Sequence, residues 1–464
     1  MNGGRRSGLA AAIVALVLLG IAFSAPYFPE RFSDFRAFYC AGSAVRAHAD
    51  PYREHPLDEC ERGVRAPGLS TLRSGVAVPA PFPGYALALF ALFAGLPFPV
   101  ASALWIMLTG GALAAAIVLL ARVTATPLAA GAIALGFPAA TVALPLGQVT
   151  PLVLLAIVAA AAALQAGRAR LAAVAALGAL LEPHVGLALV LGIAAGVPRA
   201  RITLVVGCAL LAVLGAAVSG PLHEWEYLRA VLPAHALANL ADSSQFSTAN
   251  LAYAVGFHAP AALGLGTLWY AAALGGGTWV ALRLRARLGG VALALIPPAF
   301  VVFGGTHTHL AQLALAVPAF LLVCSAARGA FREAAVAVTI VAAIPWLFIA
   351  PFPLLFPAVA VLTAAFARIM DARRYALALA AGSFAASSAI FLAIVHSHVE
   401  RGPIDAHVVG NPLAQVAWQI FVAARNTPPE SWFAVAKAPT VIAFCALLSA
   451  LVIAARNRVP VHAC

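Results

Sequence analysis

Carboxylate and imidazole side chains that could transfer protons are scarce in this 464-residue sequence, in which Asp, Glu, Lys and Arg make up 9% of the residues. Glu182 stands inside an apolar segment, where a carboxylate is costly and is usually functional or paired, here with His184 or a nearby arginine. His307 and His309 begin another apolar segment, and an imidazole titrates near neutral pH. Asp34 stands in the first turn of a predicted helix. These residues could supply acid–base chemistry.

Each of these residues also has an ordinary structural explanation. A carboxylate such as Asp34 in a first turn stabilises the helix electrostatically. His307 and His309 are two residues apart, so they reach one ligand together only if the backbone there is extended. Asp34 could complete a metal site with them, but we expect a site without a metal or a cofactor. A glutamine such as Gln148 more often caps or bridges helices than binds a substrate.

Apolar helices that cross a membrane are the elements that must position these residues. Hydrophobic residues make up 63% of the chain, whereas roughly a quarter of the residues of a soluble domain are charged. Apolar runs of about 17 to 25 residues recur from end to end, and each is long enough to cross the hydrocarbon layer as a helix. The sequence therefore predicts an all-α polytopic membrane protein with a single transmembrane domain over residues 1–464.

The formal net charge of +12 is explained by topology and not by nucleic-acid binding. Lys437 is the only lysine, and most arginines fall in short turns between apolar runs, which is typical of the cytoplasmic side of a membrane protein. We therefore expect both termini in the cytoplasm, a plasma-membrane location and no nucleic-acid partner. The preference for Arg over Lys and the abundance of Ala indicate a GC-rich bacterial genome.

About twelve membrane crossings fit between these turns. The first resembles a signal peptide, but Pro26 directly after the candidate cleavage site favours an uncleaved anchor. The predicted spans are residues 8–26, 99–121, 127–145, 148–165, 202–219, 258–282, 290–304, 308–325, 333–350, 353–368, 374–395 and 437–455.

Two apolar segments do not fit simple crossings. Residues 171–197 lie between two arginine-rich turns and are interrupted by Glu182-Pro183, so we expect two half-helices that form a hairpin. Residues 84–96 are too short to span comfortably. Because broken backbone at membrane depth survives only against protein or a water-filled cavity, both breaks predict a polar cavity within the bundle.

Three predicted outer loops hold most of the acidic residues and histidines, namely residues 27–83, 220–257 and 396–436. Because acidic residues and histidines could carry out the chemistry, their concentration in these loops predicts an active site on the outer face. Gln245 and Asn250 stand in a polar stretch of the second loop that could contact an acceptor. No Walker loop, GxGxxG fingerprint, HExxH helix or CxxC pair occurs, so nucleotide, zinc-protease and redox functions lack support.

The first outer loop begins with a predicted amphipathic helix in the outer interface, where a lipid head group would sit. Ser33 is its predicted N-cap, and one face carries Phe35, Phe38, Gly42 and Val45. Cys40 and Cys60 share this loop, which would face an oxidising compartment. A disulfide and two free thiols are equally compatible with that position.

Short motifs follow one another in a recognisable order along the chain. They are Asp34 followed by Tyr39, then Asp50-Pro51-Tyr52, Pro81-Phe82-Pro83, Leu146-Gly147-Gln148, Arg168-Ala169-Arg170 before the Glu182-Pro183 break, and residues 305–310. In this order, and on these predicted sides of the membrane, they resemble glycosyltransferase family 87. Its members are polyprenol-phosphate-mannose-dependent mannosyltransferases and their relatives, of the GT-C membrane class. The resemblance covers roughly residues 8–325.

The resemblance implies a GT-C-like bundle that transfers a hexose, first of all mannose, with inversion. The donor would be a polyprenyl-phosphate sugar reached from the membrane lipids, and the acceptor a glycolipid or polysaccharide on the outer face. The resemblance nominates Asp34 as the base, with His309 or His307 as the other candidate. The expected substrate-binding residues, including arginines suited to phosphate, are Arg36, Tyr39, Arg46, Asp50, Tyr52, Arg53, Gln148, Glu182, His184, Gln245 and Asn250.

The chain departs from the family pattern at two places. The family commonly has Lys-Pro at the hairpin break, where this chain has Glu182-Pro183, and its Tyr-Pro-Pro corresponds at best to Phe82-Pro83-Gly84. Because the basic residue of the family pattern is missing here, a donor phosphate would have to be held in another way. Two other functions therefore stay open: a transporter or flippase, because broken helices also occur in secondary transporters, and a non-catalytic relative of the enzymes.

Overall fold

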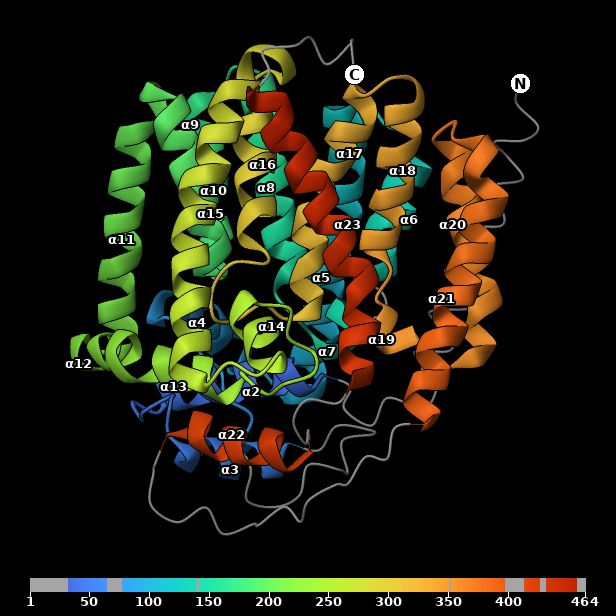
Figure 1. The fold of residues 1–464 in the computed structure, drawn as a ribbon. Helices are drawn as coiled ribbons and strands as arrows, with labels where there is room; N and C mark the ends of the chain where they lie inside the picture. Colours follow the sequence, from blue (N-terminus) through green and yellow to red (C-terminus); the bar gives the residue numbers. More distant parts are fainter. Residues whose placement is uncertain are drawn as a thin grey trace.

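The computed structural model describes residues 32–64, 77–138, 142–349, 352–396, 413–425 and 431–456. Within these ranges the chain forms helices and two isolated bridges, and no strand. Figure 1 shows a bundle of upright helices with short helices lying across one end. The all-α prediction is therefore confirmed. The predicted first span, residues 8–26, lies outside the described residues.

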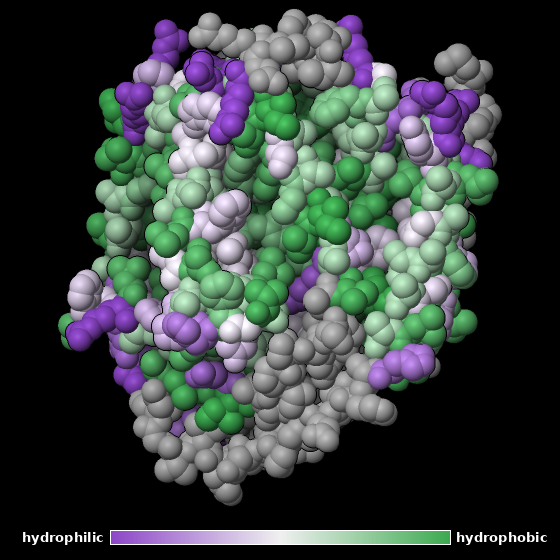
Figure 2. Space-filling view, in the orientation of Figure 1, coloured by the Kyte–Doolittle hydropathy of each residue, from purple (hydrophilic) through white to green (hydrophobic). Residues whose placement is uncertain are grey.

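Among the described residues, four helices are long and apolar enough to cross a membrane, namely Phe98–Thr124, Pro198–Ser219, Arg373–His396 and Val435–Arg456. Each coincides with a predicted span. Figure 2 shows hydrophobic residues covering the middle of the visible face, with hydrophilic residues gathered towards its two ends. This pattern, together with the helix lengths, indicates a membrane protein. The number of twelve crossings stays a prediction, because the other apolar helices are shorter.

The upright helices of the bundle are α5 (Phe98–Thr124), α6 (Leu128–Pro138), α8 (Thr150–Gln165), α9 (Ala169–Gly178), α10 (Pro183–Gly196), α11 (Arg201–Ser219), α15 (Ala259–Leu288), α16 (Ala292–Val301), α17 (Val317–Ala326), α18 (Gly329–Ala343), α20 (Phe356–Ile369), α21 (Ala376–His396) and α23 (Ser431–Arg456). The shorter helices are α2 (Ser33–Arg46), α3 (Glu54–Gly63), α4 (Gly84–Phe93), α7 (Leu144–Leu146), α12 (Pro221–Glu226), α13 (Leu232–Ala238), α14 (Thr248–Ala254), α19 (Trp346–Ile349) and α22 (Ala414–Arg425).

The two ends of the bundle differ in composition. At one end, Arg285 of α15 bonds the carbonyl of Gly196 in α10, and Arg287 bonds the carbonyl of Ala454 in α23. We call this the arginine-rich end. Helices α2, α3, α13 and α22 lie across the opposite end, at the bottom of Figure 1, which we call the loop end.

The predicted break at Glu182 is present. Helix α9 continues as a 3₁₀ turn, Ala179–Leu181, and Glu182 then adopts extended backbone angles of φ −114° and ψ 90° before α10 begins at Pro183. Helix α9 contacts both α10 and the turn Pro198–Ala200 that follows α10. The segment is therefore a hairpin of two half-helices, with its break directed away from the arginine-rich end.

Helix α2 is present but does not lie exposed at the surface as the amphipathic pattern predicts. Helix α3 covers it on one side and α4 on another, so ten of its 14 residues are buried. The Phe35 ring lies 5.1 Å from that of Trp105, centroid to centroid. At Gly42, a Cβ atom would lie 2.4 Å from the carbonyl carbon of Phe90, so only glycine allows this approach of α2 to α4.

The predicted N-cap of α2 is wrong. Phe32 occupies the cap position with a left-handed backbone and makes no side-chain cap bond. The Ser33 hydroxyl instead donates to Oδ1 of Asp34 at 3.0 Å. The helix begins one residue earlier than predicted, with Ser33 as its first helical residue, so the Ser33 side chain is not at the cap position.

Candidate active site

A cavity of about 450 Å³ lies where the hairpin break faces the helices of the loop end. It is lined by residues from all three predicted functional regions: the first outer loop, the hairpin break and the 305–310 segment. Seven predicted site residues line it, namely Asp34, Gln148, Glu182, His184, Gln245, His307 and His309. The predicted polar cavity is therefore present, and these distant segments meet in it.

Asp34 and Gln148 form one wall of this cavity. The Gln148 Nε2 atom donates to Oδ2 of Asp34, while Ser33 donates to Oδ1. An ionised carboxylate has about four acceptor positions, and the Asp34 side chain lines the cavity. Gln148 bridges two segments of the chain, as glutamines commonly do, and in doing so orients the carboxylate.

Gly147 allows this contact to form. Its φ is +76°, a left-handed conformation at the end of α7. An added Cβ would lie 2.6 Å from the Cβ of Phe35. Any other residue would therefore be strained and would push α2, and Asp34 with it, out of place.

Glu182 also lines the cavity, held by the break between α9 and α10. It is 3% exposed, and Thr150 donates to its Oε1 atom at 3.0 Å. Within the described residues Oε2 has no hydrogen-bond partner. The predicted pairing with an arginine is not found there, and the side chain nearby is the amide of Gln312.

His307 and His309 both reach the cavity because their backbone is not helical. His309 has φ −77° and ψ 150° and caps the 3₁₀ helix Leu310–Ala316 together with Gln312. The segment pairs with residues of the second outer loop, since Phe246 donates to the carbonyl of Thr308 at 2.7 Å. The extended backbone that joint action of the two histidines requires is thus present.

A polar network holds the second outer loop against this segment. The Gln245 side chain accepts from the backbone of Thr308 at 3.0 Å. Asn250 lies behind the cavity wall, donating to the carbonyls of Leu240 and Asp242. Its Oδ1 atom accepts from the buried Lys437 at 2.7 Å. Gln245 therefore lines the cavity, whereas Asn250 supports the loop that forms it.

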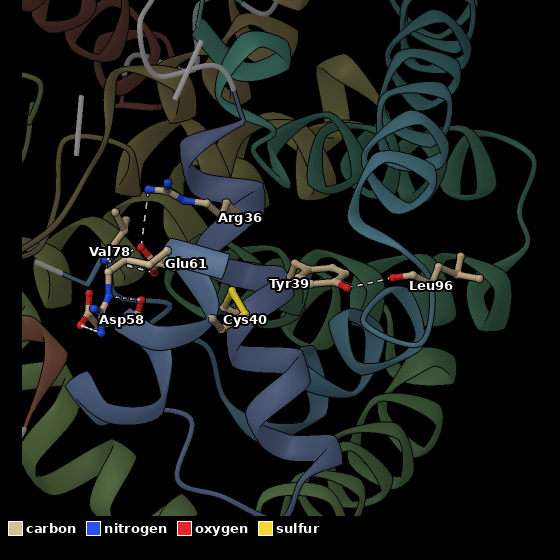
Figure 3. The surroundings of a disulfide bond; sticks show 9 residues. Arg36, Tyr39, Cys40, Asp58, Glu61, Val78 and Leu96 are labelled. Atoms are coloured by element: carbon tan, nitrogen blue, oxygen red, sulfur yellow. Dashed lines mark hydrogen bonds and ion pairs between the residues drawn. A yellow bond between two sulfur atoms is a disulfide. The ribbon is translucent and has the colours of Figure 1, made fainter. Parts of the chain in front are cut away.

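Three predicted site residues point elsewhere. Tyr39 donates from its hydroxyl to the carbonyl of Leu96 at 2.8 Å, and Figure 3 shows it directed away from Arg36. Arg46 is exposed and reaches a backbone carbonyl. Arg36 is buried, with its Nη2 atom 3.5 Å from Oε2 of Glu61. None of them lines the cavity.

Asp50, Tyr52 and Arg53 form a separate cluster beside the cavity. Arg53 bonds Asp50 at 2.9 Å and Glu226 at 2.6 Å, and the buried Tyr52 hydroxyl donates to the carbonyl of Phe82 at 2.8 Å. Oxygen and nitrogen atoms of Asp50, His223 and Glu226 lie close enough to hold a metal ion. The Arg53 guanidinium already bridges the two carboxylates, so an ion pair accounts for the cluster.

Burial shifts the pKa of several groups near the cavity that lie outside the predicted spans, among them Glu61 and His235. Burial raises the pKa of Glu61 to about 8, although Arg36 and the Val78 amide oppose the shift. Burial lowers the pKa of His235 to about 4 against the attraction of Asp242. We therefore expect His235 to be neutral at pH 7 in the structure as it stands.

The first outer loop is fixed by a disulfide between Cys40 and Cys60, which joins α2 to α3 (Figure 3). The next residue, Glu61, accepts from the Val78 amide at 3.2 Å, and Val78 lines the cavity. Of the two states that the sequence leaves open, a disulfide or two free thiols, the structure has the disulfide. Through Glu61 and Val78, this bond connects the cavity wall to α2, the helix that carries Asp34.

Sequence reasoning missed several lining residues, among them Tyr227, His235, Asp242, Tyr270, Gln312 and Trp418. One signal was available. Gln312 stands three residues after His309, the spacing of a capping box. His235 shares the second outer loop with Gln245, but histidine in a loop carries no mark of burial. Trp418 comes from α22 in the third predicted loop.

Comparison with known proteins bears on the family. The model of glycosyltransferase family 87 matches residues 82–304. No curated protein and no solved structure matches the chain. The matched segment contains Gln148, Glu182 and Gln245, while Asp34 precedes it and His309 follows it. The match confirms the resemblance to glycosyltransferase family 87 over this segment, and it supports a membrane glycosyltransferase in general.

Proposed function

We propose that the protein transfers a hexose, first of all mannose, from a polyprenyl-phosphate donor to a glycolipid or polysaccharide acceptor. The reaction takes place on the outer face of the plasma membrane, at the loop end, with both termini in the cytoplasm. The single observation that carries this proposal is the cavity that joins Asp34, the hairpin break and the 305–310 histidines.

The cavity offers one oriented carboxylate for an inverting transfer. The acceptor oxygen attacks the anomeric carbon while Asp34 takes the hydroxyl proton. The bond from that carbon to the phosphate oxygen breaks, and the electron pair leaves with the polyprenyl phosphate. Gln148 holds the Asp34 carboxylate in place, and the imidazoles line the same cavity, where the phosphate would depart.

A lysine at the hairpin break, as in the family pattern, would bring a positive charge to the cavity lining. In the described part of the chain, the lining contains no Lys or Arg, and Arg36, Arg46 and Arg53 have other contacts. Polar donors at the site must then stabilise the charge that develops on the phosphate. Histidine and amide side chains are the donors at hand.

The experiment is transfer of radiolabelled mannose from polyprenyl-phosphate mannose by the purified full-length protein, with a mixed glycolipid extract as acceptor. We expect label in glycolipid with the wild type, and a fall of about 10²- to 10⁴-fold in Asp34→Asn, the usual contribution of a general base. The exposed Glu59 supplies the matched control, since Glu59→Gln removes a carboxylate outside the cavity.

Other outcomes separate the alternatives. Undiminished transfer by Asp34→Asn would remove Asp34 from the role of base. Movement of the polyprenyl-linked sugar across a vesicle membrane without a covalent change would support a transporter instead. Binding of the donor without turnover, with every acceptor fraction tried, would support a non-catalytic relative.

A further inference from the structure

Three imidazole rings meet inside the cavity. They belong to His184 at the start of α10, His235 of α13 and His307 of the loop before the 3₁₀ helix. The ring centroids of His235 and His307 are 4.6 Å apart, and those of His184 and His307 are 6.4 Å apart. Three separate segments thus converge on one spot, which we call the imidazole cluster.

Two ring nitrogens of the imidazole cluster lack a partner. Within the described residues, His184 Nε2 and His307 Nδ1 are buried and make no hydrogen bond. A buried polar atom left without a partner costs about 1–3 kcal/mol, so native structures rarely leave two of them side by side. All three rings line the cavity. A ligand in the cavity could satisfy both atoms.

The charges around the cluster favour proton uptake when an anion enters. The titratable groups that line the cavity with it are Asp34, Glu182, Tyr227, Asp242, Tyr270 and His309. Burial lowers the pKa of His235 to about 4 and that of His307 well below its ordinary value. A neutral imidazole has one N–H donor and an imidazolium has two, and a nearby negative charge favours the protonated form.

The proposed reaction produces such an anion. A polyprenyl-phosphate sugar is a phosphodiester with one negative charge, whereas the leaving polyprenyl phosphate is a monoester whose second pKa is about 6. Transfer therefore adds one negative charge to the phosphate and releases one proton from the acceptor hydroxyl. One proton held on an imidazole would restore the charge balance of the cavity.

We propose that His184, His235 and His307 form a proton-coupled subsite for the phosphate monoester of the leaving polyprenyl phosphate, with His235 as its positioning and charge-compensating member. This assignment rests on the proposed function. The ligand class is a lipid phosphate monoester, and the imidazole cluster takes the place of a lysine or arginine clamp. Asp242 lies close enough to His235 to support its positive charge.

A metal ion is the competing occupant of three histidines. The donor atoms of this cluster are not among those that lie within 4.8 Å of one another; in the described ranges, Asp50, His223 and Glu226 form the only such group. The geometry thus favours an anion that spans the rings over a single ion that they surround.

The test measures binding of farnesyl phosphate to the full-length protein in lipid nanodiscs at pH 7.5, where this monoester is a dianion. Calorimetry in two buffers of different ionisation enthalpy gives the protons taken up per ligand. We expect net proton uptake and an affinity that falls as pH rises, by up to about tenfold per pH unit for one linked proton. His235→Gln and His307→Gln should each weaken binding at least about tenfold and abolish the uptake.

His396→Gln is the matched control, because His396 is exposed at the end of α21 and does not line the cavity; among the described residues, its hydrogen bond is to a carbonyl of its own helix. The two histidine variants lie in different segments, so the test can still be made with one of them if the other does not fold. Thermal unfolding shows whether each variant is folded. Binding without proton uptake, or unchanged affinity in both folded variants, would overturn the proposal. Equal affinity for farnesol, or for inorganic phosphate, would exclude a lipid phosphate as the ligand.

Two further results separate the inference from the function on which it rests. Proton-linked binding of farnesyl phosphate without any mannose transfer would leave the subsite standing and reject mannose transfer as the function. Mannose transfer with proton-independent binding would reject the subsite alone. Binding of one zinc ion per protein by the wild type, and of none by His307→Gln, would also overturn the proposed subsite, because a metal would then occupy the histidines.

Discussion

The amide of Gln148 donates a hydrogen bond to the carboxylate of Asp34, two residues that stand 114 positions apart in the sequence. One belongs to the loop that opens α8, the other to the first turn of α2. The contact therefore sets the orientation of the candidate base relative to the membrane helices. It also gives the glutamine a role that can be separated from substrate binding.

Replacement of Gln148 by Ala should lower kcat more than it changes KM. A hydrogen bond to a charged group contributes about 1.5–3 kcal/mol, which corresponds to a fall of roughly 10- to 100-fold in rate. Steady-state mannose transfer measures both constants. Gln165→Ala, at the exposed end of α8, should leave them unchanged. An equal rise in KM with constant kcat would assign Gln148 to substrate binding instead.

Gly147 should tolerate no side chain. A left-handed backbone costs an ordinary residue about 1–2 kcal/mol, and the close approach to Phe35 adds to this cost. We expect Gly147→Ala to lower the thermal unfolding temperature and to lose activity, because Asp34 lies next to Phe35. Gly111→Ala in α5, where a Cβ meets nothing within 4 Å, should leave stability equal or improved. A stable and active Gly147→Ala would show that α2 can shift freely.

Local features of this site could be predicted from the sequence because they are encoded locally. The Glu182-Pro183 break follows from a proline that cannot continue a helix. The cavity then follows from the cost of placing broken backbone in lipid. Each of these arguments needs only one stretch of sequence and the membrane.

Pairings between distant segments could not be predicted in this way. Arg36 lies against Glu61 and Arg53 against Glu226, so arginines that suit phosphate by type make protein contacts instead. The packing of α13 brings His235 to the cavity, and the local sequence around His235 does not predict this position. Helix α2 is buried because α3 and α4 pack against it. The amphipathic pattern of α2 does not show which other segments will cover its faces.

The Cys40–Cys60 disulfide should stabilise both the fold and the site. Its partners are 20 residues apart, and closing a loop of about this size contributes about 3 kcal/mol. We expect Cys40→Ala or Cys60→Ala, or reduction of the wild type, to lower the unfolding temperature and the transfer rate, since Glu61 then no longer fixes Val78. Cys445→Ala, at an exposed thiol of α23, should change neither. Full activity after verified reduction would contradict this role.

Glu61 should make stability fall as pH rises. Burial raises its folded-state pKa to about 8 from the ordinary 4.5, so the folded protein holds a proton that the unfolded chain releases. This contribution is therefore fully present below about pH 4.5 and is lost as pH rises to about 8. Unfolding in detergent, measured from pH 5 to 9, should show a steeper alkaline decline for wild type than for Glu61→Gln, whose amide stays neutral. The exposed Glu59→Gln should follow the wild-type curve. Identical curves for wild type and Glu61→Gln would mean that the pair with Arg36, 3.5 Å away, keeps Glu61 ionised throughout.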